Sequence, residues 1–198
     1  MLAYLFWHQP RDPDASAAYE EALTAFHRSL ARSLPVGTLA SATFRVAGLP
    51  WLSPSGEPEL AYEDWYLVED FAALGVLNEA AVGRGHVSAH DEAARRAGPG
   101  TAGVYALIEG EPCAQALGEA SLAVWIARPA GSTQRGLGEL FGDGMDPAHA
   151  SLWRRQMNLG PAPEFCLLAG ESPSGVGAER LPSGWVANVL ERDALWSG

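Results

Sequence analysis

The chain has 198 residues, of which 47% are hydrophobic and 19% are charged, enough to bury the core of one large domain or two small ones. Its formal charge of −11 is spread along the chain. Because such a surface repels phosphate backbones, we expect no nucleic-acid partner. All thirteen basic residues are arginine, which excludes enzymes that need a lysine Schiff base or a P-loop lysine.

The N-terminus, MLAYLFWHQPRD, has a short apolar run without a basic lead or a small-residue cleavage site. This pattern predicts neither a signal peptide nor a membrane span, so we expect a cytoplasmic protein without a membrane partner. The two cysteines, Cys113 and Cys166, are too far apart for a CxxC motif and indicate no disulfide framework.

The first part of the chain predicts the element order βαββαβ, from its apolar patterns and its Pro and Gly breaks. Asp14 and Asp70 are suitable N-caps for the two helices. The expected elements are a strand over 3–8, a helix over 15–33, strands over 38–46 and 62–68, a helix over 71–97 broken near 83–85, and a strand over 103–108.

The second part predicts a shorter version of the same order. Its expected elements are a strand over 121–127, a helical stretch near 135–141, a helix from about 147 to 157, and strands over 164–169 and 185–190. The segment VYALIEGEP at 104–112 resembles FCLLAGESP at 165–173, which favours a duplication without establishing one. We therefore predict an α+β protein of two ferredoxin-like units, complete over 1–110 and abridged over 111–198.

Two stretches carry a resemblance to a known family. FWHQPRDPDASAAYEEALTAFHRSL has a strand, a basic-Pro turn and a helix with a histidine, and YLVEDFAALGVLNEAAVGRGH has a strand, an acidic cap and a helix ending near a histidine. In this order of elements the chain resembles the dimeric α/β-barrel superfamily. That group includes cofactor-free monooxygenases, isomerases, dehalogenases and haem-binding enzymes. The resemblance implies a barrel-like antiparallel sheet with a central cavity, and no single reaction.

The densest polar and aromatic cluster is the predicted strand over 62–68. An acid between two tyrosines suits acid/base chemistry or the binding of a hydroxyl group. The same pattern also fits core tyrosines beside a solvated charge. Alternation gives one face Tyr62, Asp64 and Tyr66, and the other face Glu63, Trp65 and Leu67.

Candidate site residues follow from these strands. His8 ends the first strand among aromatic residues, where it can act as a base or bind a haem iron, or simply pack under the Pro10 turn. Arg45 on the neighbouring strand can pair with an acid of the 62–68 strand or with an anionic ligand. The candidate catalytic residues are His8, Asp64 and Tyr66, and the candidate ligand-binding residues are Trp7, Arg45, Tyr62 and Trp65.

The remaining histidines are weaker candidates. His27 follows Phe26 on the first helix, where a partly buried structural histidine is favoured over a catalytic one. His86 and His90 are spaced i, i+4, as two zinc or iron ligands on a helix require. However, HVSAH lacks the glutamate of HExxH, and a solvated helix end is the favoured interpretation. We therefore expect no metal and no cofactor.

These observations favour a protein that binds a small apolar or aromatic molecule in a barrel cavity, and they leave open whether acid/base groups also convert it without a cofactor. Two alternatives stay open. One is a non-catalytic oligomeric scaffold, in which the seven tryptophans form a core or an interface. The other is a haem or metal enzyme that uses His8, His27 or the His86–His90 pair. In each case we expect a homo-oligomer.

Overall fold

The computed structural model describes residues 1–52, 59–132, 149–158, 161–170 and 181–198. The first half contains β1 (Leu2–Pro10), η1 (Pro13–Ala15), α1 (Ser16–Arg32), β2 (Thr38–Ala47), β3 (Leu60–Val68), α2 (Phe71–Val82), α3 (Val87–Arg96) and β4 (Ala97–Glu109). The second half contains α4 (Ala114–Glu119), β5 (Leu122–Ala127), β6 (Ala150–Asn158), β7 (Phe165–Ala169), β8 (Val186–Glu191) and β9 (Asp193–Ser197). Within these ranges no helix combines the length and apolarity needed to cross a bilayer.

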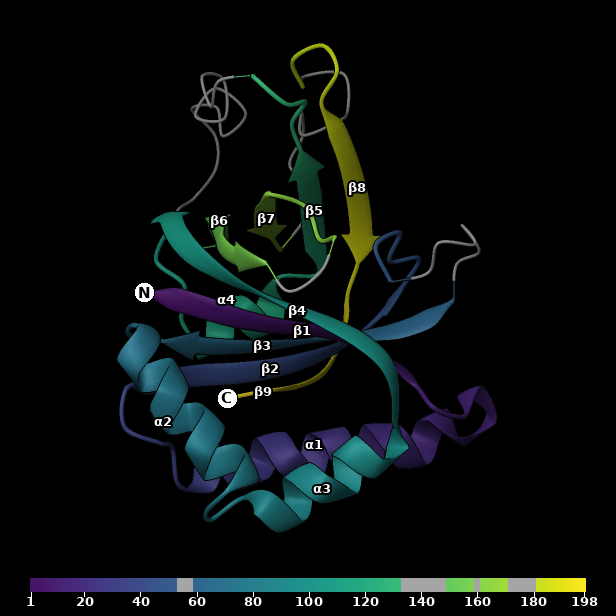
Figure 1. Ribbon diagram of the computed structural model, residues 1–198, viewed down its shortest axis with the longest axis vertical. Coiled ribbons are helices and arrows are strands. Elements are labelled where there is room, and N and C mark those ends of the chain that lie inside the picture. The colour runs from purple at the N-terminus through teal and green to yellow at the C-terminus, as the bar shows by residue number, and fades with distance from the viewer. Residues whose placement is uncertain (53–58, 133–148, 159–160, 171–180) are drawn as a thin grey trace.

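The strands form one antiparallel sheet in the order β8-β5-β7-β6-β4-β1-β3-β2-β9. Within it, β4-β1-β3-β2 is the arrangement that a βαββαβ order produces, and β8-β5-β7-β6 repeats this arrangement. The two outermost strands, β8 and β9, are consecutive in the chain and separated only by Arg192. The sheet is therefore strongly curled, and its two edge strands are joined at this point of the chain (Figure 1). The predicted α+β fold with a barrel-like antiparallel sheet is confirmed, and the division of the chain near residue 110 stays a prediction.

Side chains alternate between the two faces of this sheet, as in any strand. The concave inner face is filled by large aromatic side chains, because strands from both halves direct indoles into it. Trp51, from the loop after β2, packs edge-on against two of these indoles, with ring centroids 5.6 Å from Trp7 and 5.5 Å from Trp125. The fully buried indoles of the inner face belong to Trp7, Trp65, Trp125 and Trp153.

One ion pair lies inside the sheet among these rings. Nε of Arg192 is 3.0 Å from Oε2 of Glu63, and neither side chain is exposed to solvent. Glu63 also accepts a hydrogen bond from Nε1 of Trp7 at 3.0 Å. The Arg192 guanidinium lies 3.5 Å from the ring centroid of Phe44 and donates to the carbonyl of Ala120. Arg192, which lies between β8 and β9 in the chain, is thus linked through Glu63 to β3.

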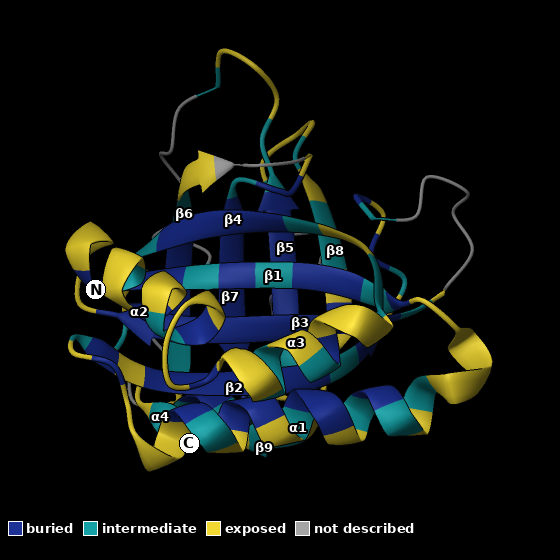
Figure 2. Ribbon diagram, turned by 60° about the horizontal axis from the view of Figure 1, so that its bottom comes forward, coloured by how far each residue is buried: buried dark blue, intermediate teal, exposed yellow. Residues whose placement is uncertain are grey.

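Helices α1, α2 and α3 lie on the outer face of the sheet, where α1 packs on β2 and α2 packs on β2 and β3 (Figures 1 and 2). The predicted apolar stripe of α1 is buried against the sheet, and the Asp70 carboxylate accepts the N–H of Ala73 at the start of α2. The predicted break after α2 is confirmed, and Gly85 has the positive φ of 72° that a glycine adopts without strain. A cavity remains between these helices and the outer face of the sheet.

The prediction for the second half is wrong at one element. Residues 150–158 form the strand β6 between β4 and β7, not part of a helix over 147–157. This segment is rich in residues with good helix propensity, but pairing with a neighbour on each side decides its structure. β9 was not predicted, and the expected helical stretch near 135–141 lies outside the described residues. With β6, the second half contains four strands in the β4-β1-β3-β2 order, one more than expected.

Candidate functional site

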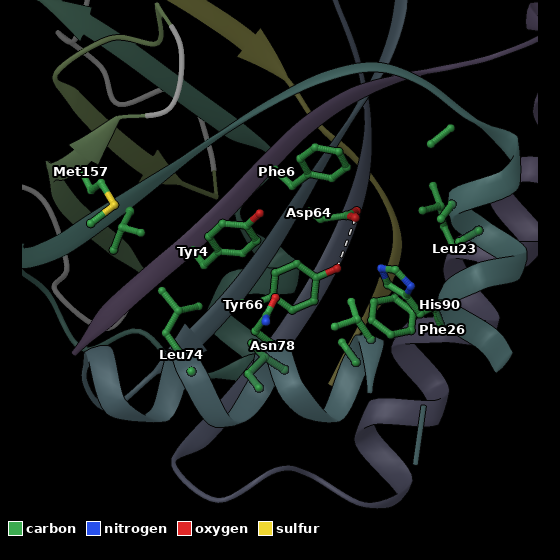
Figure 3. Close-up of a pocket in the computed structure, with 18 of the residues that line it drawn as sticks. Tyr4, Phe6, Leu23, Phe26, Asp64, Tyr66, Leu74, Asn78, His90 and Met157 are labelled. Atoms are coloured by element: carbon green, nitrogen blue, oxygen red, sulfur yellow. Dashed lines mark hydrogen bonds between the residues drawn. The ribbon is translucent and has the colours of Figure 1, made fainter. Parts of the chain in front are cut away.

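A cavity of about 700 Å³ lies between the outer face of the sheet and helices α1, α2 and α3 (Figure 3). This location differs from the expected central cavity, because indoles fill the inside of the sheet. The wall is mostly apolar, and no arginine belongs to its described lining. Its aromatic rings come from both the sheet and the helices, and they are Tyr4, Phe6, Tyr19, Phe26, Tyr66 and Phe71.

A buried cluster of two histidines and one carboxylate forms the polar part of this wall. The pairing of β1 with β3 places Phe6 opposite Asp64 and His8 opposite Tyr62, so His8 and Asp64 are diagonal neighbours on the outer face. Nε2 of His8 lies 3.2 Å from Oδ2 of Asp64. His27, from α1, places its Nε2 3.5 Å from Oδ1 of the same carboxylate. The ring N–H groups are not aligned for linear hydrogen bonds, so these contacts are electrostatic.

This environment keeps Asp64 ionised. Burial alone would raise the pKa of Asp64, but the imidazoles of His8 and His27 outweigh it and hold the pKa of this carboxyl far below its ordinary value. Asp64 is only 3% exposed and still belongs to the cavity wall, whereas both histidines are fully buried behind it. A molecule in the cavity therefore meets the carboxylate and not the imidazoles.

Three hydroxyl groups complete the cluster. The hydroxyl of Tyr19 is 2.7 Å from Nδ1 of His8, and that of Ser41 is 2.9 Å from Nδ1 of His27. Tyr66 donates to Oδ2 of Asp64 at 3.3 Å, as the dashed line in Figure 3 shows. Burial, and then the charge of Asp64, raises the pKa of Tyr19 and of Tyr66, so both phenols stay protonated at neutral pH.

Ring stacking fixes the orientation of the imidazoles. His8 stacks on Phe6 with ring centroids 4.7 Å apart and on Tyr62 at 5.6 Å. His27 stacks on Tyr66 at 5.2 Å with an interplanar angle of 11°. Each imidazole is thus held by a stacked ring on its face and by a hydroxyl at its Nδ1.

The structure brings the three candidate catalytic residues, His8, Asp64 and Tyr66, into this one cluster. The candidate ligand-binding residues are elsewhere. Trp7 and Trp65 belong to the filled inside of the sheet, because odd-numbered positions of β1 and β3 face inward.

Arg45 and Tyr62 lie outside the described cavity lining, and Tyr62 is fully buried. The guanidinium of Arg45 makes two hydrogen bonds to Glu20 and one to Asp193, and the Tyr62 hydroxyl also donates to Glu20. Arg45 therefore pairs with acids other than Glu63 and Asp64.

The two metal candidates have different surroundings. His86 is buried at the start of α3 and contacts the Ser29 hydroxyl and the Ser33 carbonyl. His90 lines the cavity and contacts Asp91. No group of three or more metal-binding side chains was found in the part of the chain that the structure describes. His8 and His27 direct both ring nitrogens at protein groups, which leaves neither nitrogen free for a haem iron.

Sequence reasoning placed less weight on His27 than the structure does, and it missed Tyr19 and Ser41. A signal for two of them was present. Tyr19 and His27 both lie on the buried stripe of α1, and polar groups on such a stripe need buried partners. The partners themselves lie on other elements, and the sequence does not show which residues α1 contacts.

Comparisons with known proteins give a likeness of fold. No family model matches the chain, and no curated protein matches it. Among solved structures, a monooxygenase-like protein from Lactobacillus acidophilus NCFM aligns with a TM-score of 0.59 and 8% identity over 100% of this chain and 95% of that one. An anthrone oxidase-like protein aligns with a TM-score of 0.53 and 10% identity over 100% of this chain and 92% of that one.

Proposed function

We propose that this protein binds a small, largely apolar aromatic molecule in the cavity between its sheet and helices, and converts it by acid/base groups of its own. The observation that carries the proposal is the cavity of about 700 Å³, whose apolar wall is interrupted by one ionised carboxylate. Binding pockets for small molecules have this composition, with a few placed polar groups in an apolar wall.

The polar part of the wall defines which ligand end it accepts. An ionised Asp64 accepts hydrogen bonds and repels anions, and the described residues of the lining include no arginine to bind an anionic group. The aromatic rings around it offer stacking surfaces. We therefore infer a ligand with an aromatic body and a neutral hydrogen-bond donor, such as a phenol hydroxyl, directed at Asp64.

The comparisons support this proposal at the level of fold. One neighbour is described as monooxygenase-like and the other as anthrone oxidase-like, and both descriptions refer to chemistry on small molecules. We also propose that the chain has the architecture of the dimeric α/β-barrel superfamily within one polypeptide, since the strand order of its first half is repeated in its second.

The scaffold alternative predicts a sheet filled by side chains, and the inside of the sheet is indeed filled. The cavity on the outer face is what favours a ligand, because a scaffold has no need of an apolar hollow beside a buried charge cluster. Homo-oligomer formation remains part of the proposal, and native mass spectrometry tests it.

The test of the proposed function is calorimetric binding of 2-naphthol to the intact protein and to two tryptophan variants. Gly75 on α2 lines the cavity, and a Cβ there meets no atom within 4 Å. We therefore expect Gly75→Trp to place an indole in the cavity without straining α2. Val76→Trp is the matched control, because Val76 is 45% exposed and lies outside the lining.

We expect saturable binding to the wild type and to Val76→Trp, and a loss of at least tenfold in affinity for Gly75→Trp. Unfolding temperatures of all three proteins check that the fold is kept. If 2-naphthol and related neutral aromatic probes do not bind the wild type, or if they bind Gly75→Trp equally well, the cavity is not a ligand site.

A further inference from the structure

The carboxylate of Asp64 is the centre of two chemically similar arms. One arm runs from Oδ2 of Asp64 to Nε2 of His8 and from Nδ1 of His8 to the hydroxyl of Tyr19. The other runs from Oδ1 to Nε2 of His27 and from Nδ1 of His27 to the hydroxyl of Ser41. Each arm has the order carboxylate, imidazole, hydroxyl, which is the order found in catalytic triads.

Only one of these arms reaches the cavity. Tyr19 belongs to the cavity wall. Ser41 is fully buried, and its backbone N–H and C=O both bond to Gly198 of the C-terminal segment. The His27 arm therefore ends inside the protein and positions the carboxylate. The His8 arm ends at a residue of the cavity wall.

The direction of the hydrogen bonds in the His8 arm follows from the phenol. Burial, and then the negative charge of Asp64, raises the pKa of Tyr19, so its hydroxyl keeps its proton and can donate a hydrogen bond to Nδ1 of His8, which is 2.7 Å away. In the tautomer that accepts this hydrogen bond the ring N–H is at Nε2, which faces Asp64 at 3.2 Å. This tautomer can accept the Tyr19 proton, and Asp64 stabilises the imidazolium that results.

We propose that Tyr19 is the catalytic group of this site, which exchanges a proton with the bound molecule while His8 acts as its base and Asp64 holds the imidazole. The proposal rests on the proposed function, since it needs a molecule bound against the cavity wall to which both Asp64 and Tyr19 belong. In this proposal His8, which is fully buried and outside the cavity wall, takes part in the chemistry through Tyr19. The Tyr19 phenol transfers the proton between the bound molecule and His8.

A covalent probe tests the relay without knowledge of the natural substrate. Benzenesulfonyl fluoride is a neutral aromatic molecule that fits the inferred ligand class. When Tyr19 attacks, the oxygen–sulfur bond forms, the sulfur–fluorine bond breaks, fluoride leaves, and the phenol proton passes to Nδ1 of His8, where the imidazolium pairs with Asp64. No oxidant or reductant takes part. A phenol without a base behind it reacts much more slowly, by roughly 10²-fold or more.

Tyr4 and Tyr66 are internal controls for the labelling of Tyr19. They line the same cavity, and their hydroxyls make no hydrogen bond to His8. We expect intact-mass analysis to show one sulfonyl group per chain, and peptide mapping to place it on Tyr19 and not on Tyr4, Tyr66 or Ser41. Tyr19→Phe removes the adduct. Asp64→Asn and His8→Gln slow its formation at least tenfold.

Tyr105→Phe is the matched control. Tyr105 is buried on the inner face, where its hydroxyl donates to the Pro163 carbonyl, so its loss leaves the rate of labelling at Tyr19 unchanged. Circular dichroism and the unfolding temperature show whether each variant is folded. If either Asp64→Asn or His8→Gln does not fold, the other variant still tests the His8 arm.

The outcomes separate this inference from the proposed function. Labelling of Tyr19 that depends on His8 and Asp64 supports the relay, whether or not 2-naphthol protects against it. Equal labelling of Tyr4 and Tyr66, labelling of Tyr19 at the same rate in both variants, or no labelling at all overturns the relay. Calorimetric binding of 2-naphthol together with any of these three results leaves the proposed function standing.

Discussion

The ion pair inside the sheet predicts a large and specific loss of stability for Arg192→Met. Arg192 lies between the two strands whose junction closes the sheet, and its guanidinium contacts Glu63, Phe44 and the Ala120 carbonyl without any exposure to solvent. Methionine keeps much of the volume over the Phe44 ring but removes the charge and both polar contacts. Glu63 is then left as a buried charge whose closest polar contact is Nε1 of Trp7.

Removing one member of a buried pair costs about 3–5 kcal/mol, most of it from the charge that is left behind. For a chain of this size a loss of 1 kcal/mol lowers the unfolding temperature by about 2–4 °C. We therefore expect the unfolding temperature of Arg192→Met to fall by roughly 6–20 °C. Glu63→Gln/Arg192→Met removes both charges and is expected to recover at least half of this loss.

Urea denaturation and thermal unfolding of the wild type, both single variants and the double variant give the coupling between the two residues. Arg45→Met serves as the control, because the Arg45 side chain is 42% exposed and its ion pairs are solvated, so about 1 kcal/mol or less is expected there. A loss below about 1 kcal/mol for Arg192→Met, or a double variant whose loss equals the sum of the singles, would refute the reasoning.

Three further predictions concern titration and backbone packing. The pKa of every one of the five tyrosines is raised, so absorbance at the phenolate band should stay low at pH 10, where free tyrosine is half ionised, and rise only as the protein unfolds. Since the pKa of Asp64 is lowered on folding, the wild type should lose stability as the pH falls below about 5, and urea unfolding should show a smaller acid loss for Asp64→Asn. Gly75→Ala should raise the free energy of unfolding by about 1 kcal/mol, whereas Gly100→Ala should lower it by about 1–3 kcal/mol, because the new Cβ would lie 2.7 Å from the Phe6 ring.

The first half of the fold could be predicted because local patterns and tertiary structure agree there. Alternation along β3 separates Asp64 and Tyr66 from Trp65 in the structure as in the sequence. The sequence could not show which of these two faces borders a cavity, since a strand pattern of period two is symmetrical between them. Which face borders a cavity depends on the summed volume of the side chains on each face. Four indoles from four different strands fill the inner face, and the pattern of one strand does not show this.

The site could be predicted only in part, for a similar reason. His8 and Asp64 are visible as unusual residues on predicted strands, and the pairing of β1 with β3 makes them neighbours. Tyr19 and His27 contact His8 and Asp64 because of the position at which α1 packs on the outer face of the sheet. The sequence of α1 does not give this position. β6 shows the opposite failure, since helix-favouring residues become a strand when β4 and β7 offer two edges to pair with.

The two halves of the sheet share a strand order but not an outer face. On β1 and β3 the outer positions include His8, Asp64 and Tyr66, whereas the corresponding strands β5 and β7 carry Val124, Ile126, Phe165 and Leu167, which pack into an apolar cluster. One described charged residue, Arg154 of β6, pairs with Phe165 at this second face and is half-buried. The proposed acid/base site uses residues of the first half, and the second half extends the sheet on both sides through the pairing of β6 with β4 and of β9 with β2. In this view the Glu63–Arg192 pair belongs to the closure and the Asp64 cluster to the chemistry, although residues 63 and 64 are adjacent in the chain: one strand serves both roles by directing successive side chains to opposite faces.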